Sequence, residues 1–167
     1  VLSQLARLDD AEAAFSGASA LRPDDANLLN NLGSVLVRLD RLPEAEAAFR
    51  RALTLDASFA AASSNLAELC ARLGRSAEAA HYHCQAFVSG PLTHKPKRML
   101  GIAYYTLNRI AEAAEVYRQW CAEEPDNPVA RHLLAACSGQ DIPPRADDAF
   151  VESIFDEYAE NFDTKLV

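Results

Sequence analysis

The sequence repeats with a period of 34 residues, and this period restricts the possible folds more than any other feature. Residues of one type recur at this spacing in three series, which are Leu5, Leu39, Leu73 and Leu107, then Arg7, Arg41, Arg75 and Arg109, then Ala11, Ala45, Ala79 and Ala113. A period of this length is typical of architectures whose units cannot bury their apolar faces alone. The chain is therefore predicted to be a stack of similar units.

Two further series indicate that each unit is a pair of helices. A small residue recurs at Gly33, Ala67, Gly101 and Ala135, where the first helix of each pair is expected to press closely on the second. A large residue recurs at Phe15, Phe49, His83 and Tyr117. Turns between the paired helices are expected at 40–43, 74–76 and 108–110, because Asp40, Gly74 and Asn108 tolerate the conformations that end a helix.

The order of these series resembles the tetratricopeptide repeat, over roughly residues 1–137. The resemblance implies an all-α fold, a right-handed superhelix (α-solenoid) of helix-turn-helix pairs. The expected divisions are a partial repeat at 1–25, repeats at 26–59, 60–93 and 94–127, the first helix of a further partial repeat at 128–140, and a Pro-Pro loop with an amphipathic helix at 141–167.

The two ends of the repeat region carry separate expectations. Residues 1–8 are expected to supply only the end of a first helix, so that the chain is a fragment and a segment upstream covers the broken repeat. Beyond the repeats, apolar residues at helical spacing predict a helix that caps the last repeat. They are Phe150, Val151, Ile154, Phe155, Tyr158 and Phe162.

The same tail has a second interpretation. The string from Phe155 to Asp163, followed by Lys165 and Leu166, resembles the segment that leads into a class I S-adenosylmethionine-dependent methyltransferase domain, as in bacterial proteins where tetratricopeptide repeats precede that domain. The resemblance implies that S-adenosylmethionine binds in a downstream domain. No cofactor is expected in this chain, because no residue of that family's cofactor site is present in it.

The resemblance also implies a concave groove lined by the first helices. The residues expected in its exposed columns are Asn27, Asn30, Asn31, Ser34, Arg38, Ser64, Asn65, Glu68, Arg72, Lys95, Arg98, Met99 and Arg131. An amide at Asn31 or Asn65 both donates and accepts hydrogen bonds, and so suits a peptide backbone. The one basic cluster, His94, Lys95, Lys97 and Arg98, is expected to open a first helix. Lys95, Arg98 and Arg131 would hold carboxylates. The alternative is that these residues are only solvated polar faces.

Composition narrows the function classes. The net charge is −8 and no basic stripe is present, which argues against nucleic-acid binding. No apolar run approaches the roughly 20 residues that span a bilayer. Four cysteines without a CxxC pair fit a reducing cytoplasm. His81 and Cys84 could share a helical face, but His83 is expected in the apolar column, so no metal site is predicted.

Three functional classes follow. The first is a non-catalytic module that binds a peptide or protein segment, as the N-terminal region of a methyltransferase. The second is the repeat region of an O-linked N-acetylglucosamine transferase-like enzyme, which the string Asn30–Gly33 resembles. The third is a free-standing adaptor or co-chaperone that binds acidic peptide ends. No nucleophile–base pair or phosphate loop indicates catalysis within these residues, and the oligomeric state stays open.

Overall fold

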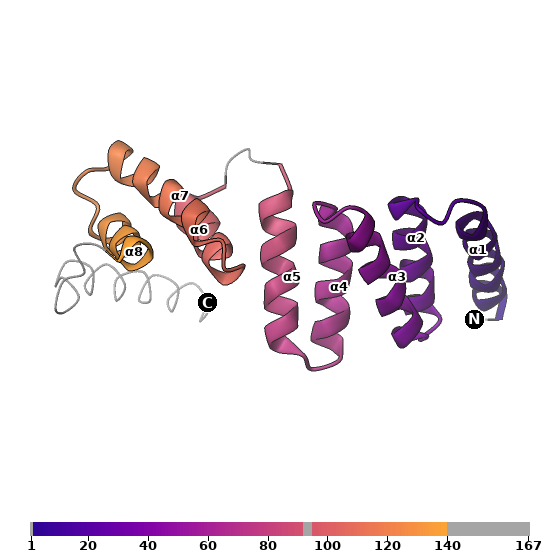
Figure 1. Cartoon of the computed structure of the whole chain (residues 1–167). Coiled ribbons are helices and arrows are strands. Elements are labelled where there is room, and N and C mark those ends of the chain that lie inside the picture. The colour runs from indigo at the N-terminus through magenta and orange to yellow at the C-terminus, as the bar shows by residue number, and fades with distance from the viewer. Residues whose placement is uncertain (1, 92–94, 140–167) are drawn as a thin grey trace. The chain divides into compact units, whose positions relative to one another are not determined.

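The computed structural model describes residues 2–91 and 95–139, and all regular structure in these ranges is α-helical (Figure 1). The helices are α1 (Leu2–Leu21), α2 (Ala26–Arg38), α3 (Leu42–Leu55), α4 (Ala60–Arg72), α5 (Ser76–Ser89), α6 (Lys97–Thr106), α7 (Ile110–Glu123) and α8 (Pro128–Ser138). The predicted all-α fold is confirmed. The predicted capping helix at 141–167 lies outside the described residues.

The helices group into two units, residues 1–92 and 93–167. In the first unit each of α1 to α4 packs on the next helix along the chain, and α2 also contacts α4 (Figure 1). In the second unit α6 packs on α7, and α7 packs on α8. Each unit is therefore a short row of antiparallel helices with its own interior.

The turns inside the helix pairs share one geometry. Asp40, Gly74 and Asn108 all have left-handed backbone conformations, with φ of 57°, 74° and 57°. After each of them, the main-chain N–H of an arginine donates 2.9 Å back to the carbonyl five residues earlier, as Arg41 does to Leu36. This is the Schellman arrangement that ends a helix, and it confirms the predicted turn positions.

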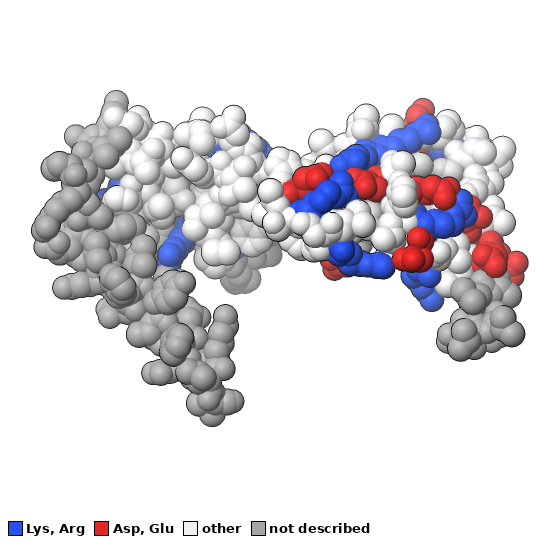
Figure 2. All heavy atoms as spheres, turned by 90° about the horizontal axis from the view of Figure 1, so that it is seen from below, with Lys and Arg blue, Asp and Glu red and all other residues white. Residues whose placement is uncertain are grey.

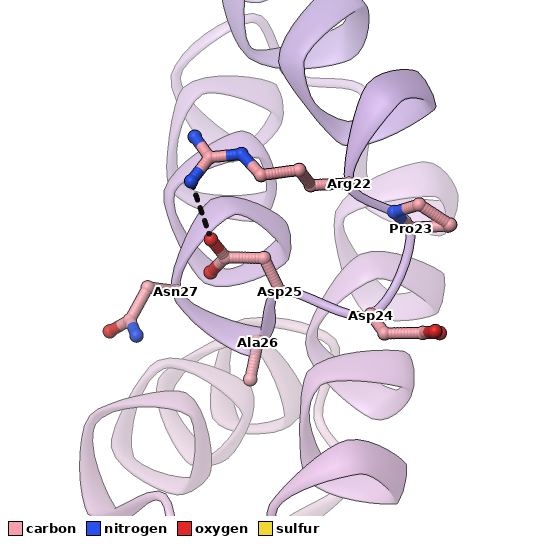
Figure 3. Close-up of a pocket in the computed structure, with 6 residues that line it drawn as sticks. All are labelled: Arg22, Pro23, Asp24, Asp25, Ala26 and Asn27. Atoms are coloured by element: carbon pink, nitrogen blue, oxygen red, sulfur yellow. Dashed lines mark ion pairs between the residues drawn. The ribbon is translucent and has the colours of Figure 1, made fainter.

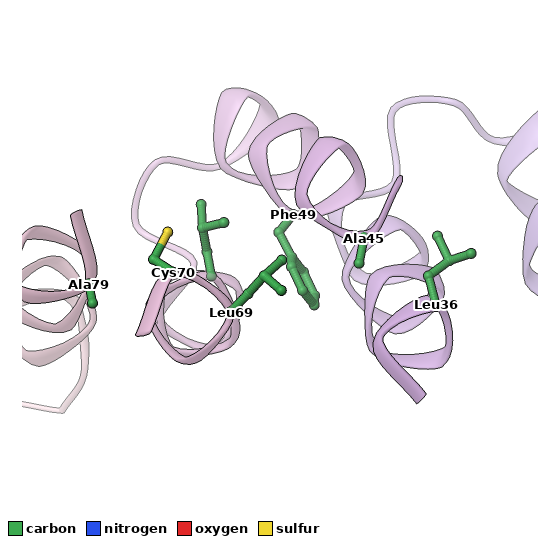
Figure 4. Packing of buried hydrophobic residues seen from close by; sticks show 7 residues of the cluster. Leu36, Ala45, Phe49, Leu69, Cys70 and Ala79 are labelled. Carbon is green, nitrogen blue, oxygen red and sulfur yellow. The ribbon is translucent and has the colours of Figure 1, made fainter. Parts of the chain in front are cut away.

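A cluster of buried side chains from α2 to α5 forms the core of the first unit (Figure 4). Phe49 lies at its centre with 1% of its surface exposed, between Leu36 of α2 and Leu69 of α4. A Cβ atom on Gly33 would lie only 2.6 Å from Cε1 of this ring. The small-residue column is thus required by close helix packing, as predicted.

The first helix differs from the expectation. Residues 1–8 were expected to supply only the end of a first helix, but residues 2–21 form one continuous helix, α1. The residue that aligns with Asp40, Gly74 and Asn108 is Ala6. Alanine is the best helix former and avoids the left-handed region, so the helix continues where the other repeats turn.

The start of the first helix in the second unit was also predicted wrongly. The helix was expected to open at His94, but α6 begins at Lys97, with Pro96 as its N-cap residue. Proline disfavours the helical conformation of the residue that precedes it, so Lys95 stays outside the helix. As a result α6 has 10 residues, whereas α2 and α4 have 13.

Ion pairs between successive second helices follow the repeat period. Arg41 pairs with Glu12 of α1 at 3.5 Å, and one period later Arg75 pairs with Glu46 of α3 at 2.8 Å. Arg50 extends the series by contacting both Glu46 and Glu78. Figure 2 shows positive and negative side chains intermingled over the first unit, as these alternating pairs require.

Candidate functional site

A hollow of about 180 Å³ lies between the first helices α2 and α4 of the first unit. We call it the α2–α4 hollow. It combines an apolar part from Val37, Phe49 and Leu69 with a polar part from Ser34, Asn65, Glu68 and Arg72. A site with apolar walls and a few oriented polar groups is the kind of surface that accepts one side chain of a ligand.

The polar part of the hollow is held by hydrogen bonds between the two helices. Asn65 Nδ2 donates to Asn30 Oδ1 at 2.9 Å and to Ser34 Oγ at 3.4 Å, while Ser34 Oγ donates to the main-chain oxygen of Asn30 at 3.0 Å. These contacts use both amide hydrogens of Asn65. Its Oδ1 oxygen has no hydrogen bond to any described residue.

This network corrects the expectation for Asn30. It was expected among exposed groove residues, but only 8% of its surface is exposed. Its side chain accepts the hydrogen bond from Asn65 and so positions the neighbouring repeat. A buried amide without such a partner would cost free energy, and the pairing with Asn65 removes that cost.

Charged side chains stand at the edge of the hollow. Glu68 and Arg72 are one helical turn apart on α4, and both are exposed. Arg72 Nη2 contacts Asp40 Oδ1 at 3.4 Å, across to the turn that follows α2. The site thus presents one carboxylate and one guanidinium group that is already paired.

Other predicted groove residues lie elsewhere. Asn27, Asn31 and Arg38 are exposed on α2 and Ser64 is half-buried on α4, but none of them lines this hollow. The remaining ones, in the second unit, are Lys95 before α6, Arg98 and Met99 on α6, and Arg131 on α8. Met99 and Arg131 are exposed, whereas Lys95 and Arg98 are half-buried.

Sequence reasoning missed the apolar lining and the pairing of Asp40. Phe49 was assigned only to the series of large residues, and Val37 and Leu69 were left unassigned, yet each borders the α2–α4 hollow. The available signal was spacing, since Val37 lies one turn after Ser34 and Leu69 lies one turn after Asn65. The same spacing also occurs on helix faces that only pack in the core, so it does not by itself indicate a binding site.

A larger and more open hollow, of about 570 Å³, adjoins the turn between α1 and α2 (Figure 3). It is lined by the six consecutive residues 22–27. Asp25 Oδ1 accepts from the main-chain N–H of Leu28 and caps α2, and Asp25 Oδ2 lies 3.3 Å from Arg22 Nη1. These contacts identify Asp25 as the residue that caps the N-terminal end of α2.

The cysteines are buried or half-buried, whereas His83 is exposed to solvent. Burial raises the pKa of the Cys70, Cys121 and Cys137 thiols, which disfavours the reactive thiolate. His83 is exposed, so its predicted place in the apolar column is wrong. Among the described residues, no group of three metal-ligating side chains converges.

Within the same ranges, none of the helices combines the length and apolar character that a membrane crossing needs.

Comparison with known proteins connects this architecture to a family. Two sequence models described as tetratricopeptide repeat match the chain, one at residues 1–58 and 45–93 and the other at 94–137. Among curated proteins, none matches significantly.

Two solved structures illustrate the similarity. YrrB, described as a TPR protein with an unusual peptide-binding site, is 24% identical to this chain, with a TM-score of 0.47. The match covers 76% of this chain and 66% of YrrB, so the chain spans slightly less than two thirds of the length of YrrB. MamA is 17% identical with a TM-score of 0.49, and the match covers 95% of this chain and 94% of MamA. Because the sequence models cover more than half of its residues, the chain belongs to the tetratricopeptide repeat family.

Proposed function

We propose that the chain is a non-catalytic protein-interaction module that binds a peptide segment across the α2–α4 hollow. The observation that carries this proposal is the juxtaposition of an apolar lining with an oriented amide. An apolar ligand side chain would contact Phe49 and Leu69, and a ligand main-chain N–H would donate to Oδ1 of Asn65. The fixed orientation of Asn65 lowers the entropy cost of binding.

The rim charges would add selectivity to this binding. Glu68 is exposed and favours a basic residue in the ligand, whereas the Arg72 guanidinium is partly neutralised by Asp40. The expected ligand is thus an extended segment with an apolar residue next to a basic one. The acidic net charge of −8 favours the same kind of partner.

A blocking substitution with a matched control tests the proposal. Glu68→Trp would cover the hollow, whereas Ala71→Trp places the same bulk at an exposed position of α4 that does not line it. Peptides are selected from a random phage-displayed library on the unmodified chain, and their affinities are measured by fluorescence anisotropy. We expect Glu68→Trp to weaken binding roughly tenfold or more and Ala71→Trp to leave it nearly unchanged.

Either of two outcomes would contradict the proposal. One is a selection that yields no peptide. The other is a set of peptides that bind both tryptophan variants equally. Circular dichroism of each variant establishes that the helices are retained, so that loss of binding is not loss of fold.

The tail supports a more specific role as the repeat region before a methyltransferase domain. Its support is the resemblance of the string from Phe155 to Asp163, which lies outside the described residues. The test is calorimetric titration of S-adenosylmethionine into the full natural protein that contains this chain. Micromolar binding is expected, with no binding to residues 1–139 alone. Absence of binding to the full protein would refute this role and leave the peptide-binding proposal intact.

A further inference from the structure

The lining of the α2–α4 hollow has a counterpart two repeat periods later, within the second unit. Six of its seven lining positions then fall on described residues, which are Ile102 and Tyr105 of α6, Tyr117 of α7, and Leu133, Ala136 and Cys137 of α8. The seventh falls on residue 140, outside the described residues. We call the surface that these six residues form the α6–α8 face.

The α6–α8 face is apolar where the α2–α4 hollow is polar. The hollow is lined by Ser34, Asn65 and Glu68, and the residues two periods later are Ile102, Leu133 and Ala136. Ile102 and Tyr105 lie one turn apart on α6, with 39% and 54% of their surfaces exposed. Large apolar side chains exposed together are typical of interaction surfaces, because their burial against a partner is favourable.

The two helices of this face are held on either side of one buried ring. Tyr117 of α7 lies against Gly101 of α6 and is only 1% exposed. Burial raises the pKa of Tyr117 to about 12, the nearby Cys137 thiol of α8 adds to this rise, and the Arg98 guanidinium of α6 opposes it. The Tyr117 side chain is therefore close to both α6 and α8, as Phe49 is to α2 and α4.

The exposure of this face does not come from the end of the row of helices at α8. A second helix paired with α8 would pack on its small residue, Ala135, as α3 packs on Gly33 of α2. Leu133 instead lies two periods after Asn65, whose side chain points to the preceding first helix through its hydrogen bond with Asn30. The face therefore lies on the side of α8 that is turned toward α6.

Acidic side chains are absent from both described helices of this face. Between residues 95 and 139, the five Asp and Glu residues all lie within 112–126, on α7 and the turn that follows it. The first turn of α6 instead contains Lys97 and Arg98, and Arg98 lies near Tyr117. A ligand carboxylate would thus meet a guanidinium group here and no acidic side chain of α6 or α8.

We propose that the α6–α8 face is a second binding surface, and that its partner is a separate protein with a segment that combines large apolar side chains and a carboxylate. Ile102 and Tyr105 remain exposed in the folded chain and would be covered by the apolar side chains, while the carboxylate would pair with Arg98. The α2–α4 hollow is expected to select a basic residue through Glu68, so the two surfaces take ligands of opposite charge. They share no residue, and either proposal can fail without the other.

A peptide selection with the first site blocked tests this proposal. Peptides are selected from a random phage-displayed library on the full chain with Glu68→Trp, which removes the α2–α4 hollow from the selection. We expect the selected peptides to combine aromatic or aliphatic residues with Asp or Glu. Ala136→Trp, added to this chain, covers the α6–α8 face and should weaken their binding roughly tenfold or more in fluorescence anisotropy. Ala122→Trp, at an exposed position of α7 that does not belong to the face, is the matched control and should leave binding nearly unchanged.

A charge exchange tests the role of Arg98. Arg98→Glu should weaken binding of the selected peptides roughly tenfold, whereas Arg118→Glu, the same charge change on α7, should have little effect. A peptide whose carboxylate is replaced by lysine should bind the Arg98→Glu variant better than it binds the chain that retains Arg98. Such a recovery of affinity cannot result from a loss of structure in the variant.

Several outcomes would overturn the proposal. They are a selection that yields no peptide, peptides that bind equally with and without Ala136→Trp, and peptides enriched in Lys and Arg instead of Asp and Glu. Self-association of the chain that Ala136→Trp abolishes in light scattering would assign the face to a second copy. Displacement of the selected peptides by a synthetic peptide of residues 147–163 would assign it to the tail of this chain.

Discussion

At the scale of single residues, the distance between paired helices depends on one missing methyl group. A Cβ at Gly33 would lie 2.6 Å from the Phe49 ring, and one at Gly101 would lie 2.3 Å from the Tyr117 ring. The intervening repeat has alanine in this column, at Ala67, and its ring position, His83, is exposed. Alanine is therefore tolerated where no aromatic ring occupies the space.

The first prediction concerns this contact. Gly33→Ala should lower the free energy of unfolding by about 1–3 kcal/mol, because the added methyl group overlaps Phe49 in a closely packed core. Phe49→Leu provides the test of mechanism, since a smaller side chain makes room for the methyl group. In urea denaturation the double variant should be more stable than the sum of the two single changes predicts. Strict additivity would contradict the proposed overlap.

A second prediction concerns backbone conformation. Gly74 ends α4 with φ of 74°, whereas Gly17 lies inside α1, where an added methyl group would meet nothing within 4 Å. Gly74→Ala should therefore destabilise the fold by about 1–2 kcal/mol, since alanine resists the left-handed region. Gly17→Ala should stabilise it by about 0.5–1 kcal/mol. Thermal unfolding of both variants gives the comparison, and shifts of the same sign would refute this explanation.

At the scale of helices, the sequence predicted the structure correctly where the residue at a repeated position also favours the conformation that the period indicates. The turns at Asp40, Gly74 and Asn108 were predictable, because residues that tolerate left-handed geometry recur at one period. The continuous α1 was missed, because the period placed the end of a first helix within residues 1–8, whereas Ala6 favours a helical conformation. The α2–α4 hollow was only partly predictable, since its apolar lining consists of residues that also belong to the core.

The ion pairs between second helices carry a prediction about acid stability. Glu46 accepts from Arg75, and this hydrogen bond, with the nearby charge of Arg50, holds the pKa of Glu46 below its usual value. A carboxyl group whose pKa is lower in the folded state stabilises the fold above its unfolded-state pKa of about 4.3. That stabilisation is lost as the pH falls through the folded-state pKa.

The Glu46→Gln variant tests this contribution. We expect it to lower stability at pH 7 by about 1 kcal/mol, because the pair is only partly shielded from solvent. At a pH below the folded-state pKa the variant and the unmodified chain should have nearly equal stability. Glu115→Gln, which removes an exposed pair with Arg118, is the control and should have little effect at either pH. An equal loss at both pH values would rule out the linkage.

At the scale of the whole chain, the two units have separate interiors built on the same contact. The first is organised around Phe49 beneath Gly33, and the second around Tyr117 beneath Gly101, each ring only 1% exposed. In repeat proteins stability is the sum of local terms and contacts with nearest neighbours. A change inside one unit should therefore act mainly on the helices of that unit.

Hydrogen exchange with Gly33→Ala and Gly101→Ala examines this division directly. We expect Gly33→Ala to reduce amide protection mainly in α2 to α5 and to leave α6 to α8 nearly unchanged, because its overlap with Phe49 loosens only the first interior. Gly101→Ala should produce the reverse pattern. The two variants serve as controls for each other, since both add one methyl group against an aromatic ring. A uniform loss of protection along all described helices in both variants would show that the chain unfolds as one cooperative unit, contrary to this prediction.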